Sequence, residues 1–560
     1  MAGVRRLGFA EERFKVKGKK RSLAGSCVIA LLAFAVAAGS LHAQELDAAR
    51  REIKHVVVLF QENVSFDHYF GTYPKALNPE GEPFFHALPG TPTVDGYSRA
   101  LLTRNPNELN SQNGRGRSNP FRLDRSQAAT ADQSHDYTAE QQAFDGGKMD
   151  LFPASVGHPD GPRIPGSHPG VLATSGITMG YYDGNTVTAY WNYAQHYAMS
   201  DHHFDVIFGP STPGAIDLVS GQTNGVVNDQ NAQGDMAPDG SGGFTLISDP
   251  DPTRDVCSST SDPLVHMTGR NIGDLLTAAH VSWGFFEGGF DLGMVNANGS
   301  TGCRRNTTSK WTRVRERDYA PHHEPFQYYA STANPKHIRP SSAGVVGSNN
   351  DGGANHQYDT HDFFDAIDAG DFPAVSYLKA PAYQDGHAGY SDPLDEQQWI
   401  VRVINFLEKR PEWRHTAVII AYDDSDGWYD HVMGAIVNGS STPNDRLNGA
   451  GRCGDGATAL PGVKPADAHA QGRCGPGPRL PLLVISPWAK ANYVDHTVTD
   501  QTSILRLIED LFLKDRRLGQ GSFDANSGSL LGMFDFSKNT PQNAGTLILN
   551  PDTGTVASGK

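Results

Sequence analysis

Two pairs of oxygen-bearing side chains follow apolar runs of the sequence. Glu62-Asn63 come just after IKHVVVLF, and Asp423-Asp424 come directly after TAVIIAY. Clustered carboxylates resist burial unless a positive charge compensates them. Their oxygens suit a hard divalent ion such as Ca²⁺, Mg²⁺ or Mn²⁺. Either pair alone would equally suit a helix N-cap or an acidic loop, so the prediction of a metal site depends on the two pairs meeting.

A hydroxyl group that could act as a nucleophile lies in GPSTPG, residues 209–214. Pro213 suits the first position of a helix, and we expect Thr212 to be its cap. A hydroxyl at a helix start lies at the positive end of the helix dipole, which favours an alkoxide and a phosphate group. A nearby metal would lower the hydroxyl pKa further. An ordinary helix start would have the same sequence.

Several histidines stand in turn-like, Gly- and Asp-rich contexts. Histidine can hydrogen-bond phosphoryl oxygens, and it adds positive charge when protonated. Any one of them, taken alone, is more often structural. The candidates are His135 in DQSHDY, His322 and His323 in APHHEPF, His387 in DGHAGYSD and His496 in YVDHTVTD.

The elements that must position these residues have the patterns of an α/β fold. Continuous apolar runs at 53–60, 416–422 and 481–488, with a weaker one at 374–380, are typical of buried parallel strands. Helical periodicity covers 394–410 and 500–512. This alternation predicts a mostly parallel sheet flanked by helices. Ligands bind beyond the carboxyl ends of such strands, so both carboxylate pairs should lie at the same edge.

The N-terminal segment has the order of an export signal. KVKGKKR precedes the apolar run CVIALLAFAVAAG, and small residues lead to Ala43. We expect cleavage near Ala43 and a periplasmic or secreted bacterial protein. A membrane anchor is the alternative, but the run is short for a span. Sec and twin-arginine export both stay open.

The rest of the chain, 44–560, is expected to be one domain with surface excursions around 85–130, 225–275 and 436–478.

Cys453 and Cys474 bracket one Gly/Pro-rich loop, which favours pairing them and leaves Cys257 with Cys303. The formal net charge of −15 argues against nucleic acid and anionic membranes as partners.

Taken together, the segments resemble the bacterial phosphoesterase family that contains non-haemolytic phospholipases C and respiratory-burst-inhibiting acid phosphatases. The resemblance runs from residue 53 to about residue 512. It rests on IKHVVVLFQENVSFDHYFG, MGYYDG, YWNYAQHYAMSDHHFDVIFGPSTPG, DYAPHHEPFQYY, DGHAGYSDPLDEQQW, VIIAYDDSDGWYDHV and RLPLLVISPWA.

This resemblance implies an alkaline-phosphatase-like core with long loop insertions and one divalent ion (Ca²⁺, Mg²⁺, Mn²⁺ or Zn²⁺). It implies Glu62, Asn63, Ser211, Asp423 and Asp424 as the metal ligands. Ser211, rather than Thr212, would be the nucleophile and would form a phosphoserine.

The resemblance also implies that three of the histidines contact the phosphoryl group: His135, His323 and His387. His323 matches better than His322 because it directly precedes the acid-Pro-Phe sequence. The family commonly has Arg where this chain has Val64. The missing cation bears on substrate affinity or headgroup choice and leaves the ligands intact.

The acid phosphatase branch looks closer, because its motifs are similar to GPSTPG, HHEPFQYY and DDSDGWYDH. Phospholipases C typically have GPT-x-PN and DE-x-GG-x-YDH at the corresponding places. The resemblance therefore favours an exported acid phosphatase acting on phosphate monoesters. The alternatives are a phospholipase C that cleaves the phosphodiester of phosphatidylcholine-type lipids and, more distantly, a non-catalytic exported binding protein.

Overall fold

The structure is a computed structural model that describes residues 43–157, 174, 176–454, 471–538, 540–543 and 545–557. Residues 1–42 of the expected export signal lie outside the described residues, as do residues 455–470 of the third excursion. Residues Ala48–Lys560 form one unit by their contacts.

Eight strands form the central sheet, in the order β14-β11-β15-β1-β16-β17-β4-β18. Only β17 runs against its neighbours, pairing antiparallel with both β16 and β4. The bounds are β1 (His55–Gln61), β4 (Ala198–Ser200), β11 (Trp283–Glu287), β14 (Gln357–Asp359), β15 (Val375–Lys379), β16 (Thr416–Tyr422), β17 (Leu482–Ile485) and β18 (Tyr493–Asp495).

The four strands expected from the sequence are all present in this sheet, which confirms the α/β class. One prediction was wrong: the run at 481–488 contains β17, which is antiparallel to β16. A strand covered on both faces is apolar throughout whichever way it runs, and every residue of β17 is buried. Its apolar pattern therefore carries no information about direction.

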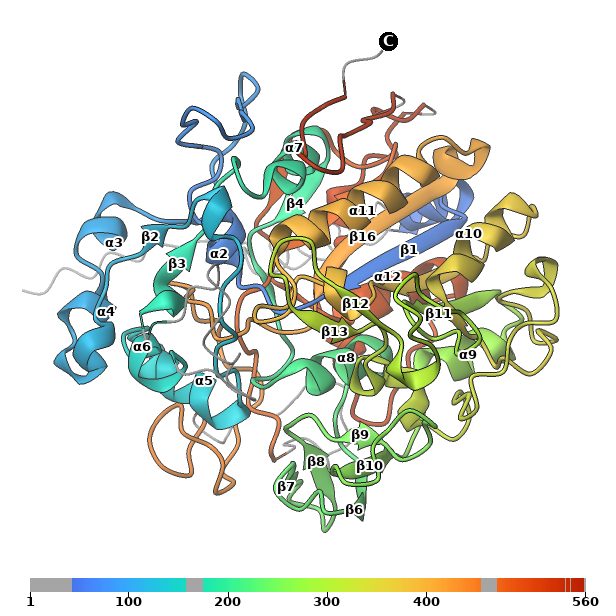
Figure 1. The fold of residues 1–560 in the computed structure, drawn as a ribbon, viewed down its shortest axis with the longest axis horizontal. Coiled ribbons are helices and arrows are strands. Elements are labelled where there is room, and N and C mark those ends of the chain that lie inside the picture. Colours follow the sequence, from blue (N-terminus) through green and yellow to red (C-terminus); the bar gives the residue numbers. More distant parts are fainter. Residues whose placement is uncertain are drawn as a thin grey trace, which may run out of the picture. The chain divides into compact units, whose positions relative to one another are not determined.

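Helices lie on the sheet in two groups. Helices α7 (Thr188–His196) and α11 (Pro393–Leu407) contact each other, whereas α8 (Ser211–Ser220) contacts α9 (Ile272–Ala278) and α12 (Thr502–Phe512). Figure 1 shows α11 in front of β1 and β16, with α10 (Thr360–Asp368) beside it. The predicted helices at 394–410 and 500–512 are thus confirmed as α11 and α12.

Helix α11 begins where its sequence provides a cap. The carboxylate of Asp392 accepts hydrogen bonds from the backbone N–H groups of Leu394 (2.8 Å) and Asp395 (2.9 Å), and Pro393 occupies the first turn. A capping acid followed by proline is a strong helix start, because it satisfies free N–H groups and presets the first φ angle.

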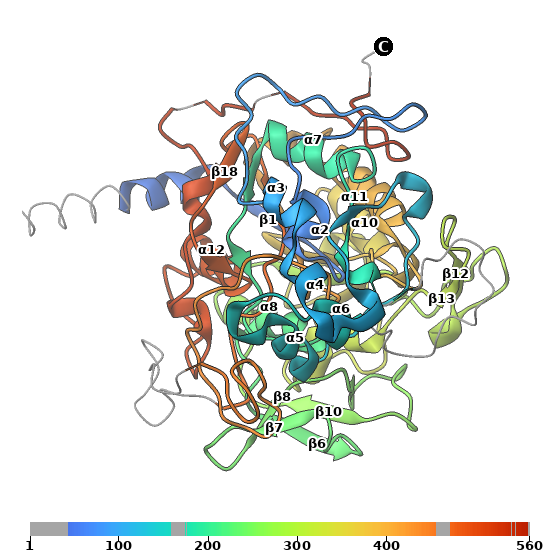
Figure 2. The same cartoon turned by 90° about the vertical axis from the view of Figure 1, so that its left-hand side faces the viewer.

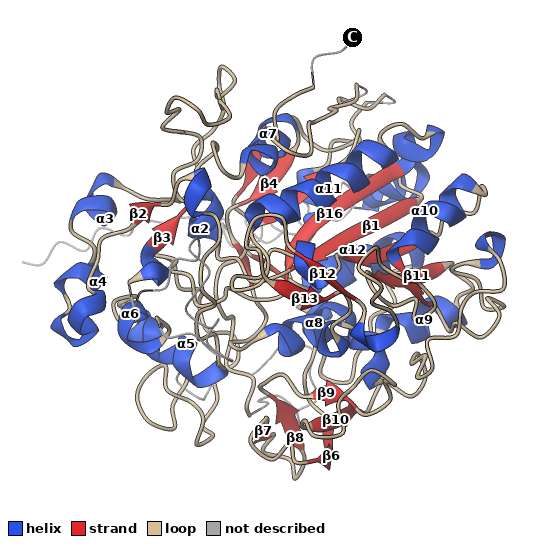
Figure 3. Ribbon diagram, viewed as in Figure 1, coloured by secondary structure: helices blue, strands red, loops and turns tan. Residues whose placement is uncertain are grey.

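Long loops surround the sheet (Figure 3). The excursion at 225–275 carries a three-stranded sheet and a hairpin, which lie together at the bottom of Figures 1 and 2. Further short α-helices are α2 (Phe66–Phe70), α3 (Arg99–Thr103), α4 (Pro106–Leu109), α5 (Tyr137–Phe144) and α6 (Phe152–Ser155). The remaining strands are β2 (Phe121–Arg122), β3 (Gly180–Tyr181), β5 (His203–Phe204), β6 (Val226–Gln230), β7 (Met236–Pro238), β8 (Phe244–Leu246), β9 (Asp251–Pro252), β10 (Leu264–Met267), β12 (Asn306–Thr308), β13 (Arg315–Arg317) and β19 (Thr499–Asp500).

Two disulfides, Cys257–Cys303 and Cys453–Cys474, cross-link the loops. Both pairings are those expected from the sequence. Within the described ranges, no helix is both long and apolar enough to cross a bilayer.

Candidate active site

The two carboxylate pairs meet because β1 and β16 are neighbouring parallel strands. Gln61 and Tyr422 are paired at the ends of these strands, so Glu62 and Asp423 leave the sheet at the same edge. The chain turns sharply at Asn63, which adopts a left-handed backbone (φ 61°). Its N–H donates to Oδ1 of Asp423 (3.0 Å). All these side chains are buried.

Ser211 completes this group from the first residue of α8. Its Oγ lies 3.1 Å from Oε2 of Glu62, 2.9 Å from Oδ2 of Asp424 and 3.3 Å from the side-chain amide of Asn63. A serine hydroxyl has one proton to donate, yet two carboxylate oxygens lie within reach of it. All of these oxygens could instead coordinate one divalent cation together. The group therefore fits the ligands of a hard metal ion.

The helix starts two residues earlier than expected. Its first residue is Ser211 and its N-cap is Pro210, so the prediction that Thr212 caps the helix was wrong. Thr212 lies inside the first turn, and its N–H donates to Oδ1 of Asp249 (2.8 Å). Pro213 lacks an N–H and is tolerated anywhere in the first turn, so it does not fix the helix start.

Gly214 lets α8 approach the end of β16. A Cβ atom on this residue would lie 2.0 Å from the carbonyl oxygen of Asp423. Any larger residue would push the helix away from the strand. The close contact brings the start of α8 to the carboxylates at the end of β16.

Lys379 is a site residue that the sequence reasoning missed. It is the last residue of β15, on the other side of β1, and its ammonium group forms an ion pair with Glu62 and lies 3.4 Å from Oδ2 of Asp423. Burial would lower the pKa of Lys379, but Asp423 and Glu62 outweigh it and raise the pKa. The signal in the sequence was the charged residue in the apolar run AVSYLKA.

The charges within the group are unequal. Burial would raise the pKa of Glu62, but His323 and Lys379 hold that pKa well below its usual value. Burial and the nearby Glu62 charge raise the pKa of Asp423 well above its usual value. Burial also raises the pKa of Asp424, to about 6, against the opposing effect of His135. The single positive charge of Lys379 does not neutralise the negative charge of three neighbouring acids. This imbalance again fits the binding of an additional cation.

Three predicted histidines lie around the carboxylates. Nδ1 of His323 is 3.4 Å from Oε1 of Glu62. Nδ1 of His135 is 3.5 Å from Oδ1 of Asp426, and Nε2 of His387 is 3.3 Å from the Asn63 amide. The ligand atoms of Glu62, His323 and Asp385 lie within 4.8 Å of one another, and so do those of His135, His387 and Asp426.

The other two histidines point elsewhere. His322 lies 3.6 Å from Oδ1 of Asp251, and His496 binds Asp201 at the end of β4. Val64, the position where the family commonly has arginine, is buried, and its N–H donates to the carbonyl of Asp424 (2.9 Å).

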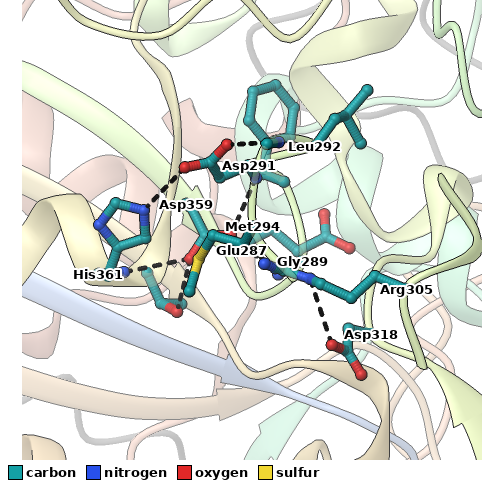
Figure 4. Close-up of polar contacts among 12 residues, drawn as sticks. Glu287, Gly289, Asp291, Leu292, Met294, Arg305, Asp318, Asp359 and His361 are labelled. Atoms are coloured by element: carbon teal, nitrogen blue, oxygen red, sulfur yellow. Dashed lines mark hydrogen bonds and ion pairs between the residues drawn. The ribbon is translucent and has the colours of Figure 1, made fainter. Parts of the chain in front are cut away.

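A buried arginine, Arg305, joins two loops close to the segment that carries His323. Figure 4 shows Arg305 beside Asp318; their ion pair is 3.3 Å long, and Nη2 of Arg305 lies 3.0 Å from Oδ2 of Asp359. The same Asp359 oxygen accepts the N–H groups of Gly289 (3.1 Å) and Asp291 (2.9 Å). These contacts connect the loop after β11 with residue 318, shortly before the turn Pro321–His323.

The protein thus combines an α/β fold with a cluster of oxygen ligands that could bind a metal ion and a buried serine at the start of a helix. A family model described as the phosphoesterase family matches residues 53–513, and the chain belongs to that family. The expectation drawn from the sequence is confirmed at this level.

The chain is similar to several phospholipases C. It is 26% identical to the non-hemolytic phospholipase C of Pseudomonas aeruginosa over 82% of this chain and 54% of that protein. It is 23% identical to phospholipase C B of Mycobacterium tuberculosis over 87% of this chain and 78% of that protein. The chain thus spans about half the length of the Pseudomonas protein. These relatives support the phospholipase alternative better than the acid phosphatase expected first.

Proposed function

We propose that this protein is a metal-dependent hydrolase of phosphoric esters and that its substrate is a phosphodiester, as for a phospholipase C. The observation that carries the proposal is the placement of Ser211 Oγ at the first turn of α8, 2.9 Å from Asp424 and 3.1 Å from Glu62. A nucleophile, an oxygen-rich cation site and a helix N-terminus are the three parts that phosphoryl transfer through serine requires.

In this mechanism Ser211 Oγ attacks phosphorus in line with the leaving alcohol. The positive end of the α8 dipole and the side chains of His135, His323 and His387 stabilise the negative charge that accumulates on the phosphoryl oxygens. The alcohol departs, and water then cleaves the phosphoserine. A divalent ion held by Glu62, Asn63, Ser211, Asp423 and Asp424 would supply Lewis-acid activation of the hydroxyl and neutralise charge.

The preference for a diester rests on the similarity to phospholipases C. A monoesterase of the acid phosphatase type is the second candidate, and the motifs around Ser211 and Asp426 favour it. Asp426 is buried beside His135, at the position where phospholipases C of the family typically have glycine. Electrostatically, however, an additional acid there would disfavour the more negatively charged monoester and would favour a diester with a cationic headgroup.

Export is part of the proposal. Disulfides form and persist in oxidising compartments, and this chain has two. We therefore place the mature protein, from about residue 44, in the periplasm or the medium.

A paired substrate assay on purified protein tests the function. Hydrolysis of p-nitrophenylphosphorylcholine is compared with hydrolysis of p-nitrophenyl phosphate, after chelation and after return of Ca²⁺, Mg²⁺, Mn²⁺ or Zn²⁺. A higher kcat/KM on the diester supports the phospholipase proposal, and the reverse supports the monoesterase. No hydrolysis of either compound with any ion would overturn both and favour a binding protein.

A further inference from the structure

A second group of metal-ligating side chains lies at the end of the sheet farthest from β14. Strands β4 and β18 are parallel neighbours, with Ser200 paired to Asp495. The next residues on each strand, Asp201 and His496, therefore emerge side by side at the same edge. His202 follows Asp201 directly. The parallel pairing thus brings together two imidazoles and a carboxylate that are 295 residues apart in the chain.

The ligand atoms of these three residues converge on one point. Nδ1 of His202 and Nδ1 of His496 each lie 2.8 Å from the same oxygen, Oδ1 of Asp201. Ligand atoms from all three residues lie within 4.8 Å of one another. The Asp201 side chain is fully buried, whereas that of His496 is 63% exposed, so the group is anchored on the inside and open to solvent outside.

The carboxylate is fixed before any ion arrives. The backbone N–H of Asp95 donates to Oδ2 of Asp201 (2.8 Å), which leaves Oδ1 for the two histidines. The guanidinium of Arg479 donates to the backbone carbonyl of Asp201 (3.0 Å) and holds the main chain. Support of this kind around a ligand reduces the entropy lost when a metal binds.

Two similar groups do not qualify. Asp67, Asp430 and His431 already have a cation, because Nη2 of Arg479 lies 3.0 Å from Asp67 and 3.1 Å from Asp430. The other group consists of Asp255, Cys257 and His337. Its Cys257 forms a disulfide and therefore has no thiolate that could bind a metal.

We infer that Asp201, His202 and His496 form a second metal site, specific for Zn²⁺ or a related imidazole-binding ion. Two nitrogens and one carboxylate suit zinc in tetrahedral geometry, and the open side toward solvent leaves room for water as the fourth ligand. With bonds of about 2.1 Å, tetrahedral ligand atoms lie roughly 3.4 Å apart. The two imidazoles would therefore move outward by only about half an ångström. The inference does not rest on the proposed hydrolase function.

The chemistry of this site differs from that of the Ser211 site. Nitrogen ligands select zinc over Mg²⁺ and Ca²⁺, whereas the carboxylate and amide oxygens near Ser211 accept the harder ions. An ion at Asp201 would cross-link the ends of β4 and β18, the last two strands of the sheet, and would stabilise the folded chain by mass action.

Isothermal titration of the whole mature protein with Zn²⁺ tests this site. We compare the wild type with His202→Ala and His496→Ala, and use His266→Ala as the matched control, because His266 also pairs with one aspartate, Asp229 (2.7 Å), but has no second histidine in that contact. Asp424→Asn removes a proposed ligand of the other site. Circular dichroism confirms that each variant is folded.

The expected result is that His202→Ala and His496→Ala each bind about one zinc equivalent fewer than the wild type and His266→Ala. Asp424→Asn should keep that equivalent, and Mg²⁺ or Ca²⁺ should not compete for it. Unchanged zinc stoichiometry in both histidine variants would overturn the inference, as would loss of this equivalent on adding excess Mg²⁺. Neither result depends on whether the protein hydrolyses any ester.

Discussion

Ser211 Oγ lies 2.9 Å from Oδ2 of Asp424, although 213 residues separate the two in the chain. The contact follows from two features of the fold: Asp424 is two residues past the end of β16, and Gly214 allows α8 to approach that end closely. The nucleophile proposed here is thus positioned by backbone packing, and the hydrogen bond is its consequence.

Replacing Ser211 by alanine should abolish hydrolysis. The variant loses the atom that attacks phosphorus, and removal of a serine nucleophile typically lowers kcat by roughly 10⁴-fold or more. We expect the thermal midpoint of unfolding to change little. The acids around Ser211 repel one another, so this group contributes little net stability that the loss of one hydroxyl could remove. Steady-state kinetics on p-nitrophenylphosphorylcholine and p-nitrophenyl phosphate, together with a melting curve, measure both effects.

Thr212→Val is the matched control for Ser211→Ala. It removes the neighbouring hydroxyl and keeps the backbone N–H that donates to Asp249. This variant should retain activity within about tenfold. Activity that survives in Ser211→Ala but disappears in Thr212→Val would transfer the role of nucleophile to Thr212.

Lys379→Met should destabilise the metal-free protein. Without the ammonium group, Asp423 loses its positive partner and Glu62 keeps only His323, and breaking a buried ion pair typically costs about 3–5 kcal/mol. A divalent ion should restore much of this loss, because it compensates the same carboxylates. Chemical unfolding in chelator and with added Mg²⁺ or Ca²⁺ measures the difference.

Lys310→Met serves as the surface control, since Lys310 is 53% exposed and pairs with Asp552. Its unfolding free energy should change by less than about 1 kcal/mol. If Lys379→Met were equally stable in chelator and in metal, the ammonium group and the ion would not share the same carboxylates.

The strand and helix positions were predictable because burial patterns are local. The runs that form β1, β16 and α11 have continuous or helical apolar periodicity. The meeting of Glu62 with Asp423 followed from a general rule about parallel strand ends. Each required only the residues themselves and the assumption that the two strands belong to one sheet.

What the sequence could not provide is information that depends on tertiary neighbours. The direction of β17 depends on the connection that precedes it, and its apolar residues fit either direction. Lys379 ends a strand in which every residue is buried, yet its partners Glu62 and Asp423 directly follow two other strands, β1 and β16. The convergence of His496 with Asp201 requires the pairing of β4 with β18, two strands of three residues each, which are too short to show a pattern.

Arg305→Met tests whether the buried arginine positions His323. The substitution leaves Asp318 and Asp359 without their cation, and we expect a loss of about 3–5 kcal/mol of stability. Arg410→Met is the control, because Arg410 pairs with Asp368 on the surface (2.7 Å). If Arg305 also positions His323, kcat/KM should fall below that of Arg410→Met at a temperature where both variants are folded. Equal kcat/KM would limit Arg305 to a structural role.

The stability of the fold should also fall at alkaline pH because of His431. Burial would lower the pKa of this imidazole, but Asp67, whose carboxylate lies 2.6 Å from its Nδ1, and Asp430 raise the pKa to about 9. The unfolded value is about 6.5. A pKa that is higher in the folded state contributes stability that is complete below about pH 6.5 and is lost as the pH rises through about 9. The contribution is at most about 3 kcal/mol.

Urea unfolding of the wild type and His431→Gln at pH 6, 7.5 and 9.5 measures this contribution. The difference in unfolding free energy between the two proteins should be largest at pH 6 and should shrink as the pH rises, because in the wild type Asp67 then loses the charge of His431 and keeps only Arg479 as a charged partner. His266→Gln, beside Asp229 on the surface, controls for removing a histidine. A wild-type advantage that stayed constant from pH 6 to 9.5 would mean that the neutral imidazole contributes as much as the charged one.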